Sequence, residues 1–135
     1  PGMSELLESL ASHPACEILR QADIDDFLAA NPRALLFFTG DVSARREGLD
    51  VAVVVRELAS DYEKHLQIGL VDRRDETALM ERFGVVMTPA VVYVRDGQAI
   101  EIVARMRDWP MFAQACDRLL AAVHETPEPG TGGIT

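Results

Sequence analysis

The sequence predicts an α/β domain of three layers, in which a mixed β-sheet lies between helices and an extra helix precedes the first strand. Three observations predict this class. Apolar runs of strand length alternate with segments of helical periodicity, a hairpin signal separates the last two strands, and 48% of the 135 residues are hydrophobic, as in globular chains. We expect one domain over residues 3–124 and a disordered tail over 125–135, where Pro, Gly and Thr dominate.

Two helices and one short strand are expected before the first long apolar run. Ser4 can cap a helix that ends before His13-Pro14, and Asp23 can cap a second helix that Asn31-Pro32 ends. The short strand between these two helices is expected at Cys16–Leu19.

The central part of the chain alternates strand and helix. Residues 34–38 are apolar on both faces, which is typical of a buried strand in a parallel sheet. The β-branched residues at 51–55 favour a strand locally. Apolar residues nevertheless recur at helical spacing over 47–65, and this wider pattern predicts a helix. The next strand is expected over 66–71.

A helix and a β-hairpin are expected next. Asp75 can cap the helix, and Gly84 suits its C-terminal end because glycine adopts a positive φ easily. Asp96-Gly97 is a strong signal for a two-residue turn, and it lies between the strands expected at 90–94 and 99–104.

The last helix is expected from Trp109 to about His124, with Asp108 as its cap. We interpret Trp109 as an anchor of this helix on the sheet rather than as a binding hot spot. At their spacings, most of four methionines are expected in the core: Met80, Met87, Met106 and Met111.

The charge balance excludes some classes of protein. The chain has 22 acidic and 13 basic residues, a net charge of −9 with His neutral, whereas nucleic-acid binding requires clustered Lys and Arg. No unbroken apolar run exceeds five residues, while a membrane-spanning helix needs about 20. The sequence also has no charged-then-apolar start of the signal-peptide kind, so we expect a cytoplasmic protein.

Cysteine and histidine give no sign of a redox pair or a metal site. Cys16 and Cys116 form no C-x-x-C pair, and we expect two buried, inert thiols. The sequence leaves open whether these two cysteines meet in space. The three histidines are scattered without metal-ligand spacing. We therefore expect no metal and no cofactor.

The main motif is Phe-Gly-Val-Val-Met-Thr-Pro at 83–89, which comes just before an expected strand and hairpin. A proline in this position cannot donate to the sheet, and an X-Pro bond suits a tight turn. Together with the strand, loop and long helix from residue 34 onward, this order resembles the thioredoxin fold over about 34–120. The resemblance implies a cis proline at Pro89. It also implies an open backbone just before Pro89, to which an extended peptide can add as a strand.

The sequence departs from thioredoxins at their catalytic position. Thioredoxins have a C-x-x-C motif between the first core strand and the long helix, where the helix N-terminus lowers a thiol pKa. Residues 41–48 here are Asp-Val-Ser-Ala-Arg-Arg-Glu-Gly, without cysteine, and Ser43 has no evident histidine partner. We therefore expect no dithiol oxidoreductase activity and no catalytic residue. The candidate peptide-binding residues are Asp41, Val42, Ser43, Met87, Thr88 and Pro89.

Most of the chain is similar to hydrogenase expression/formation accessory proteins of the HyaE/HupG type. The similarity covers the N-terminal helix, the segment at 23–28, Phe-Phe-Thr-Gly-Asp at 37–41, the cysteine-free loop, Glu-Arg-Phe-Gly-Val at 81–85 and Trp-Pro at 109–110. It implies a chaperone rather than an enzyme, which acts in the maturation of nickel–iron hydrogenase. The implied partner is the twin-arginine signal peptide of the small-subunit precursor, bound before export.

The acidic N-terminal region fits a cationic partner of this kind. Residues 3–30 contain six acids and one base, Arg20, and an acidic surface steers a cationic peptide mainly through the association rate. The preferred alternative is that these carboxylates cap helices and face solvent. The residues of this candidate acidic docking surface are Glu5, Glu8, Glu17, Asp25 and Asp26.

Two other functions stay open at this point. The first is a structural adaptor that binds other maturation proteins instead of the signal peptide. The second is a redox enzyme with a single thiol, Cys16 or Cys116. Arg45-Arg46 could bind an anion at a helix start, but a solvated pair is the preferred interpretation.

Overall fold

The computed structural model describes residues 2–62 and 64–125. All but the first residue of the tail expected over 125–135 therefore lies outside the described residues. The expected order of helices and strands is confirmed, with short 3-10 turns before α2 and α4. The elements are α1 (Gly2–Ala11), β1 (Cys16–Leu19), α2 (Ile24–Ala30), β2 (Arg33–Phe38), α3 (Glu47–Asp61), β3 (Gln67–Val71), α4 (Glu76–Phe83), β4 (Ala90–Arg95), β5 (Gln98–Ala104) and α5 (Trp109–Glu125).

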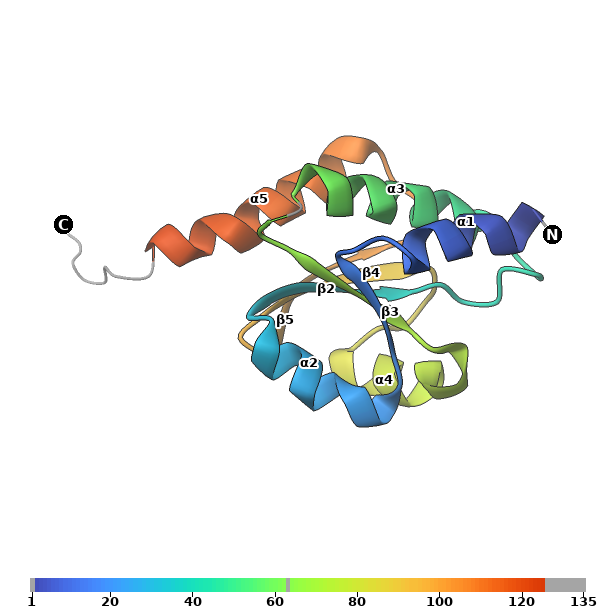
Figure 1. Ribbon diagram of the computed structural model, residues 1–135, viewed down its shortest axis with the longest axis horizontal. Coiled ribbons are helices and arrows are strands. Elements are labelled where there is room, and N and C mark those ends of the chain that lie inside the picture. Colours follow the sequence, from blue (N-terminus) through green and yellow to red (C-terminus); the bar gives the residue numbers. More distant parts are fainter. Residues whose placement is uncertain (1, 63, 126–135) are drawn as a thin grey trace.

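The five strands form one mixed sheet in the order β1-β3-β2-β4-β5. Strands β1 and β2 each pair in parallel with β3, whereas β4 pairs antiparallel with β2 and, through the hairpin, with β5. Figure 1 shows α1, α3 and α5 on one face of the sheet and α2 and α4 on the other. The three layers and the mixed sheet are as predicted.

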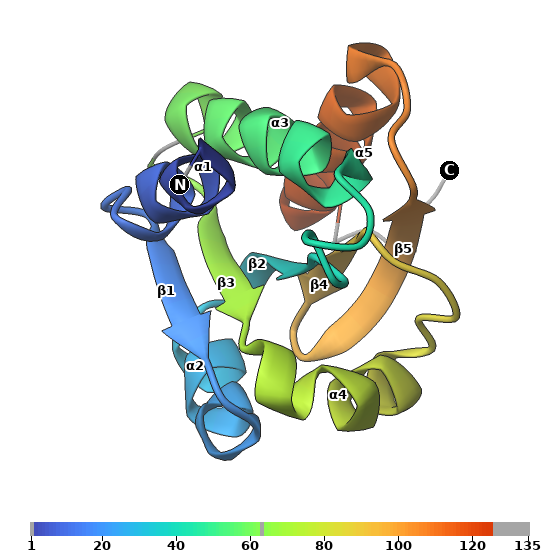
Figure 2. The same cartoon turned by 90° about the vertical axis from the view of Figure 1, so that its right-hand side faces the viewer.

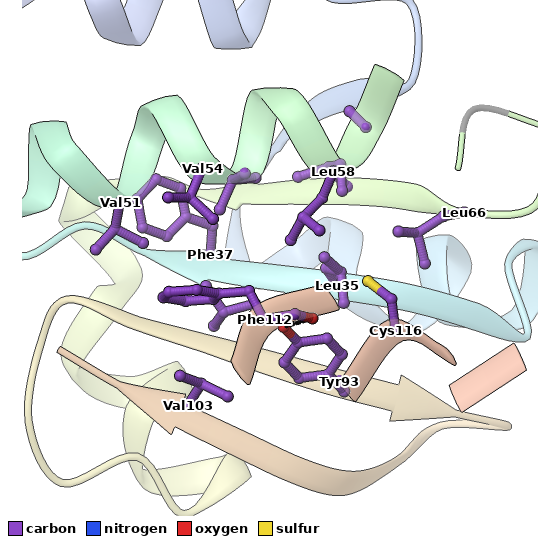
Figure 3. Packing of buried hydrophobic residues seen from close by; sticks show 14 of the residues in the cluster. Leu35, Phe37, Val51, Val54, Leu58, Leu66, Tyr93, Val103, Phe112 and Cys116 are labelled. Atoms are coloured by element: carbon purple, nitrogen blue, oxygen red, sulfur yellow. Dashed lines mark hydrogen bonds between the residues drawn. The ribbon is translucent and has the colours of Figure 1, made fainter. Parts of the chain in front are cut away.

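The central strand β2 contributes to both cores because successive side chains of a strand point to opposite faces. Leu35 and Phe37 pack under α3 and α5, and Ala34, Leu36 and Phe38 pack over α2 and α4. All five are fully buried, and burial of each large side chain is worth about 1.5–3 kcal/mol. Figure 3 shows the first of these cores, where side chains of the sheet meet those of α3 and α5.

Two helix boundaries differ from the sequence prediction. Helix α1 begins at Gly2, so Ser4 lies inside the helix and not at its cap. Helix α3 ends at Asp61 and not at residue 65, because the backbone of Tyr62 leaves the helical conformation, with a φ of −115° and a ψ of 29°. The Tyr62 hydroxyl also donates a hydrogen bond of 2.8 Å to the carboxylate of Asp117 in α5. This contact with a distant helix fixes the point at which the chain leaves α3.

Asp23 and Asp75 occupy the predicted N-cap positions, but their carboxylates do not cap α2 and α4. The Asp23 carboxylate accepts from the backbone N–H of Arg20 at 2.9 Å. The Asp75 carboxylate accepts from the backbone N–H of Gln21 at 2.7 Å and from the Arg20 side chain at 3.1 Å. Both acids thus bind the segment that follows β1, and Asp75 joins that segment to α4.

The predicted turn residues are confirmed. Gly84 closes α4 in the left-handed conformation, with a φ of 78°. Asp96 and Gly97 have φ values of 51° and 82°, the two positive values that the favoured hairpin turn requires.

Candidate functional site

The loop after β2 and the loop before β4 meet at the carboxyl end of β2. Figure 2 is viewed onto this end, with the loop between β2 and α3 near the centre. The two loops enclose a small cavity of about 200 Å³. The residues that line it are Thr39, Gly40, Asp41, Ala44, Arg45, Thr88 and Pro89.

Gly40 allows the two loops to approach each other closely. Its φ is 72°, and a Cβ atom at this position would lie 2.4 Å from the Oγ1 atom of Thr88. The bond between Thr88 and Pro89 is cis, as the resemblance to thioredoxins implied. The cavity therefore depends on a residue without a side chain at the end of β2.

A buried carboxylate accepts a hydrogen bond from the backbone of the loop after β2. Glu76, in the first turn of α4, is 2% exposed. One of its oxygens accepts from the backbone N–H of Gly40 at 3.0 Å, and the other accepts from the guanidinium of Arg73. Hydrogen bonds to charged groups are worth about 1.5–3 kcal/mol. Sequence reasoning missed Glu76, because an acid in the first turn of a helix is usually a solvated side chain.

The rest of the loop after β2 is organised by Asp41. Its carboxylate accepts from the hydroxyl of Ser43 at 2.6 Å and from the backbone N–H groups of Ser43 and Ala44. The hydrogen bond from the Ser43 side chain is the main cause that lowers the pKa of Asp41. The hydroxyl of Ser43 thus donates within a turn, and Val42 lies half-buried near the start of α3.

An ion pair fixes the segment between β5 and α5 beside this loop. The Glu47 carboxylate accepts from the guanidinium of Arg105 at 2.7 and 3.0 Å and from the backbone N–H of Met106 at 2.7 Å. These hydrogen bonds lower the pKa of Glu47, and the bond from the Arg105 side chain has the largest effect. The N–H of Arg105 also donates to Pro89 at 2.7 Å. The segment after β5 is thereby joined to Pro89, which lines the cavity, and to the first residue of α3, which follows the loop.

Apolar side chains are exposed at this end of the molecule. The expectation that most of the methionines lie in the core is wrong, since of the four only Met80 packs against it. Trp109 is also exposed, because α5 turns Phe112 and the following apolar residues toward the sheet instead. We call the exposed set the apolar surface, and its members with their exposed fractions are Val86 86%, Met87 45%, Met106 40%, Trp109 38% and Met111 51%.

The backbone before Pro89 is open. Within 2–62 and 64–125, no hydrogen bond to another backbone group engages Val86, Met87 or Thr88. An extended peptide can add a strand to such a segment through main-chain hydrogen bonds. Of the six predicted residues, the structure brings Asp41, Thr88 and Pro89 together in the cavity. Val42 and Ser43 support the loop, and Met87 lies on the apolar surface.

The predicted acidic docking residues do not share one face. Glu5 and Glu8 lie on α1, Glu17 lies on the edge strand β1, and Asp25 and Asp26 lie on α2. Helices α1 and α2 cover opposite faces of the sheet (Figure 1). Asp25 also forms an ion pair of 2.7 Å with a basic side chain of α4. These acids therefore lie on separate parts of the molecule.

Both cysteines are free, with Cys116 buried and Cys16 half-buried. Burial raises the pKa of Cys16 to about 11 and that of Cys116 to about 12, from an ordinary value of 9.0. Figure 3 shows Cys116 among the core side chains of α5 and the sheet. Both thiols are therefore protonated at neutral pH, whereas the thiolate is the reactive form.

These raised pKa values predict a loss of stability at alkaline pH. The unfolded chain releases the thiol protons first, so the contribution of the two thiols to the free energy of unfolding is constant up to about pH 8 and falls from about pH 9 upward. The raised pKa values of Tyr62 and Tyr93 act in the same direction from about pH 10. We expect the unfolding temperature, followed by circular dichroism, to decrease less between pH 9 and 10 in a Cys16→Ser/Cys116→Ala variant. An equal decrease in both proteins would contradict the assignment to the thiols.

The fold and this site define a thioredoxin-like protein without the C-x-x-C pair. A thioredoxin from Halobacterium salinarum superposes with a TM-score of 0.64 at 23% identity, covering 77% of this chain and 91% of that one, and this likeness concerns the fold alone. The chain belongs to the family described as Hydrogenase-1 expression protein HyaE, which matches residues 6–112.

Named relatives agree with this family. The hydrogenase expression/formation protein HoxO of Cupriavidus necator is 34% identical over 131 residues, which are 96% of this chain and 80% of that protein. The hydrogenase expression/formation protein HupG of Rhizobium leguminosarum is 36% identical over 115 residues, 82% of this chain and 77% of that protein. A crystal structure described as HupG of Rhodopseudomonas palustris is 31% identical, with a TM-score of 0.55, over 80% of this chain and 97% of that one.

Its family and its fold together identify this chain as a hydrogenase expression/formation protein with a thioredoxin-like fold. In the part of the chain that the structure describes, none of the helices combines the length and apolar character needed to cross a membrane.

Proposed function

We propose that this protein is a chaperone without redox activity that binds the signal peptide of the hydrogenase small-subunit precursor in the cytoplasm before export. The open backbone of residues 86–88 beside the apolar surface carries this proposal. It offers main-chain hydrogen bonds to an extended peptide and apolar contacts to that peptide's side chains. Methionine side chains adapt their shape to varied apolar partners.

The charges around the cavity favour one part of such a peptide. Arg45 lines the cavity and Arg46 precedes α3, and both are exposed. Asp41 also lines the cavity, but its carboxylate accepts hydrogen bonds from Ser43 and Ala44 of its own loop. Arg45 and Arg46 repel the arginines at the start of a twin-arginine leader. The apolar stretch of the leader therefore occupies the site, and its cationic start extends away from Arg45 and Arg46. This arrangement differs from the docking on N-terminal acids that composition suggested.

Trp109 is the only tryptophan of the chain and belongs to the apolar surface, so its fluorescence reports on the site directly. The test is a titration with three synthetic peptides: the whole leader, its apolar stretch and its cationic start. We expect saturable changes in Trp109 emission with the first two peptides, with dissociation constants within about tenfold of each other. Binding of the cationic start alone, or of none of the three, would contradict the proposal.

The second candidate is a structural adaptor that binds other maturation proteins through the same apolar surface. The exposure of its five apolar side chains favours it, since exposed apolar residues that gather in a patch often mark protein–protein contacts. The two functions differ in one measurement. If the leader of the precursor is replaced by an unrelated export signal, co-purification should be lost for a leader-binding chaperone and retained for an adaptor.

A further inference from the structure

A second concave site lies at the other end of the sheet, where β2 and β3 begin. It is a pocket of about 480 Å³. The length of β2, six residues, separates it from the candidate peptide site by roughly 20 Å. We call it the cationic pocket, and its lining residues are Asn31, Pro32, Arg33, Lys64, His65, Leu66 and Gln67.

Basic side chains converge on this pocket. Arg33, Lys64 and His65 line it, and no acid is found among its described lining residues. The chain as a whole has a net charge of −9, so this concentration of basic groups runs against the overall composition. A concave surface that is lined by one sign of charge attracts ligands of the opposite sign.

Arg33 lacks adequate partners within the fold. It pairs in register with Arg95 of the neighbouring strand β4, and like charges directly opposite destabilise a sheet. Its Nη1 atom donates a long hydrogen bond of 3.3 Å to the carbonyl oxygen of Pro32 and lies 3.4 Å from the carboxylate of Asp96. The Asp96 side chain is 71% exposed, so this ion pair is weak. The Nε atom of Arg33 is buried and has no hydrogen-bond partner among the described residues.

An ordinary structural role explains part of this cluster but not Arg33. Lys64 and His65 follow the C-terminus of α3, where positive charge is favoured by the helix dipole. Arg33 begins a strand and takes no part in such a helix end. A buried donor without an acceptor is costly when it belongs to a charged group. The side chain as a whole is 18% exposed and lines the pocket, so a further acceptor reaches this guanidinium through its Nη atoms and not through the buried Nε.

We propose that the cationic pocket binds a small organic anion that carries a carboxylate or phosphate group. Guanidinium groups bind both of these oxyanions with two parallel hydrogen bonds. The amides of Asn31 and Gln67 are available for hydrogen bonds to the rest of the ligand, and Pro32 and Leu66 provide apolar walls. The volume falls within the range of about 300–1,000 Å³ that is usual for small-molecule sites. This site is independent of the proposed peptide-binding function.

The test is an NMR titration of the isotope-labelled full chain with citrate and, separately, with glucose 6-phosphate. Sodium chloride at matched ionic strength is the reference. We expect saturable shifts of the Arg33 Nε–H resonance and of the backbone amides at 64–67, with a dissociation constant below about 1 mM. Saturation with citrate alone identifies a carboxylate site, and saturation with the sugar phosphate alone identifies a phosphate site.

Matched variants separate a built site from general charge attraction. Lys64→Ala/His65→Ala changes two exposed side chains, and we expect it to weaken binding of the anion about fivefold or more. Arg45→Ala/Arg46→Ala removes two exposed positive charges at the other end and should leave the affinity unchanged. The proposal is overturned by shifts that do not saturate, by equal shifts with chloride, or by equal losses in the two double variants.

Discussion

Replacement of Gly40 by alanine is expected to lower the free energy of unfolding by about 3 kcal/mol and to abolish peptide binding. A residue with a side chain costs about 1 kcal/mol or more at the φ of 72° that Gly40 adopts. The new Cβ atom would also lie 2.4 Å from Oγ1 and 2.9 Å from Cβ of Thr88. Relief of such overpacking costs about 1–3 kcal/mol. The relief must move Thr88, and with it the open backbone that the peptide requires.

Gly84→Ala is the matched control for this variant. Gly84 has a similar φ of 78°, but a Cβ atom there would meet nothing within 4 Å. We expect a loss of about 1 kcal/mol in urea unfolding and unchanged peptide affinity. If Gly40→Ala lost no more stability than Gly84→Ala and still bound the peptide, the contact between the two loops would not shape the site.

The parts of the fold that the sequence predicted depend on local patterns. The alternation of strands and helices follows from apolar periodicity, and the turn at Asp96-Gly97 follows from the two positive φ values that these residues tolerate. The helix that begins at Glu47 was predicted despite its run of valines, although over 47–65 and not to Asp61, because apolar residues recur along one face of it. The absence of cysteine from residues 41–48, before and at the start of α3, could also be read from the sequence alone.

The parts that the sequence could not predict depend on contacts between distant residues. Glu76 binds Gly40, which lies 36 residues away, and Glu47 binds Arg105, which lies 58 residues away. Neither acid differs in sequence from a solvated residue in the first turn of a helix. The same limit explains the acidic docking surface. Its residues are close along the chain, but the short strand β1 connects helices on opposite faces of the sheet.

Two single variants, Met87→Glu and Met111→Glu, are each expected to weaken binding of the apolar peptide stretch at least about tenfold, which is about 1.4 kcal/mol. Both side chains are about half exposed, so we expect the unfolding temperature to change by less than about 4 °C. In the complex, each carboxylate would be covered by an apolar partner, and loss of its hydration opposes binding. Trp109 fluorescence measures the affinity, and circular dichroism measures the stability.

Val53→Glu is the control for Met111→Glu, because both residues lie on helices and are 52% and 51% exposed. It adds the same charge on α3, at a residue that is not part of the apolar surface, so the affinity should be unchanged. A loss equal to that of Met111→Glu would mean that net charge, and not contact, decides peptide binding. If Met87→Glu and Met111→Glu kept full peptide affinity but lost co-purification with other maturation proteins, the apolar surface would belong to the adaptor and not to the chaperone.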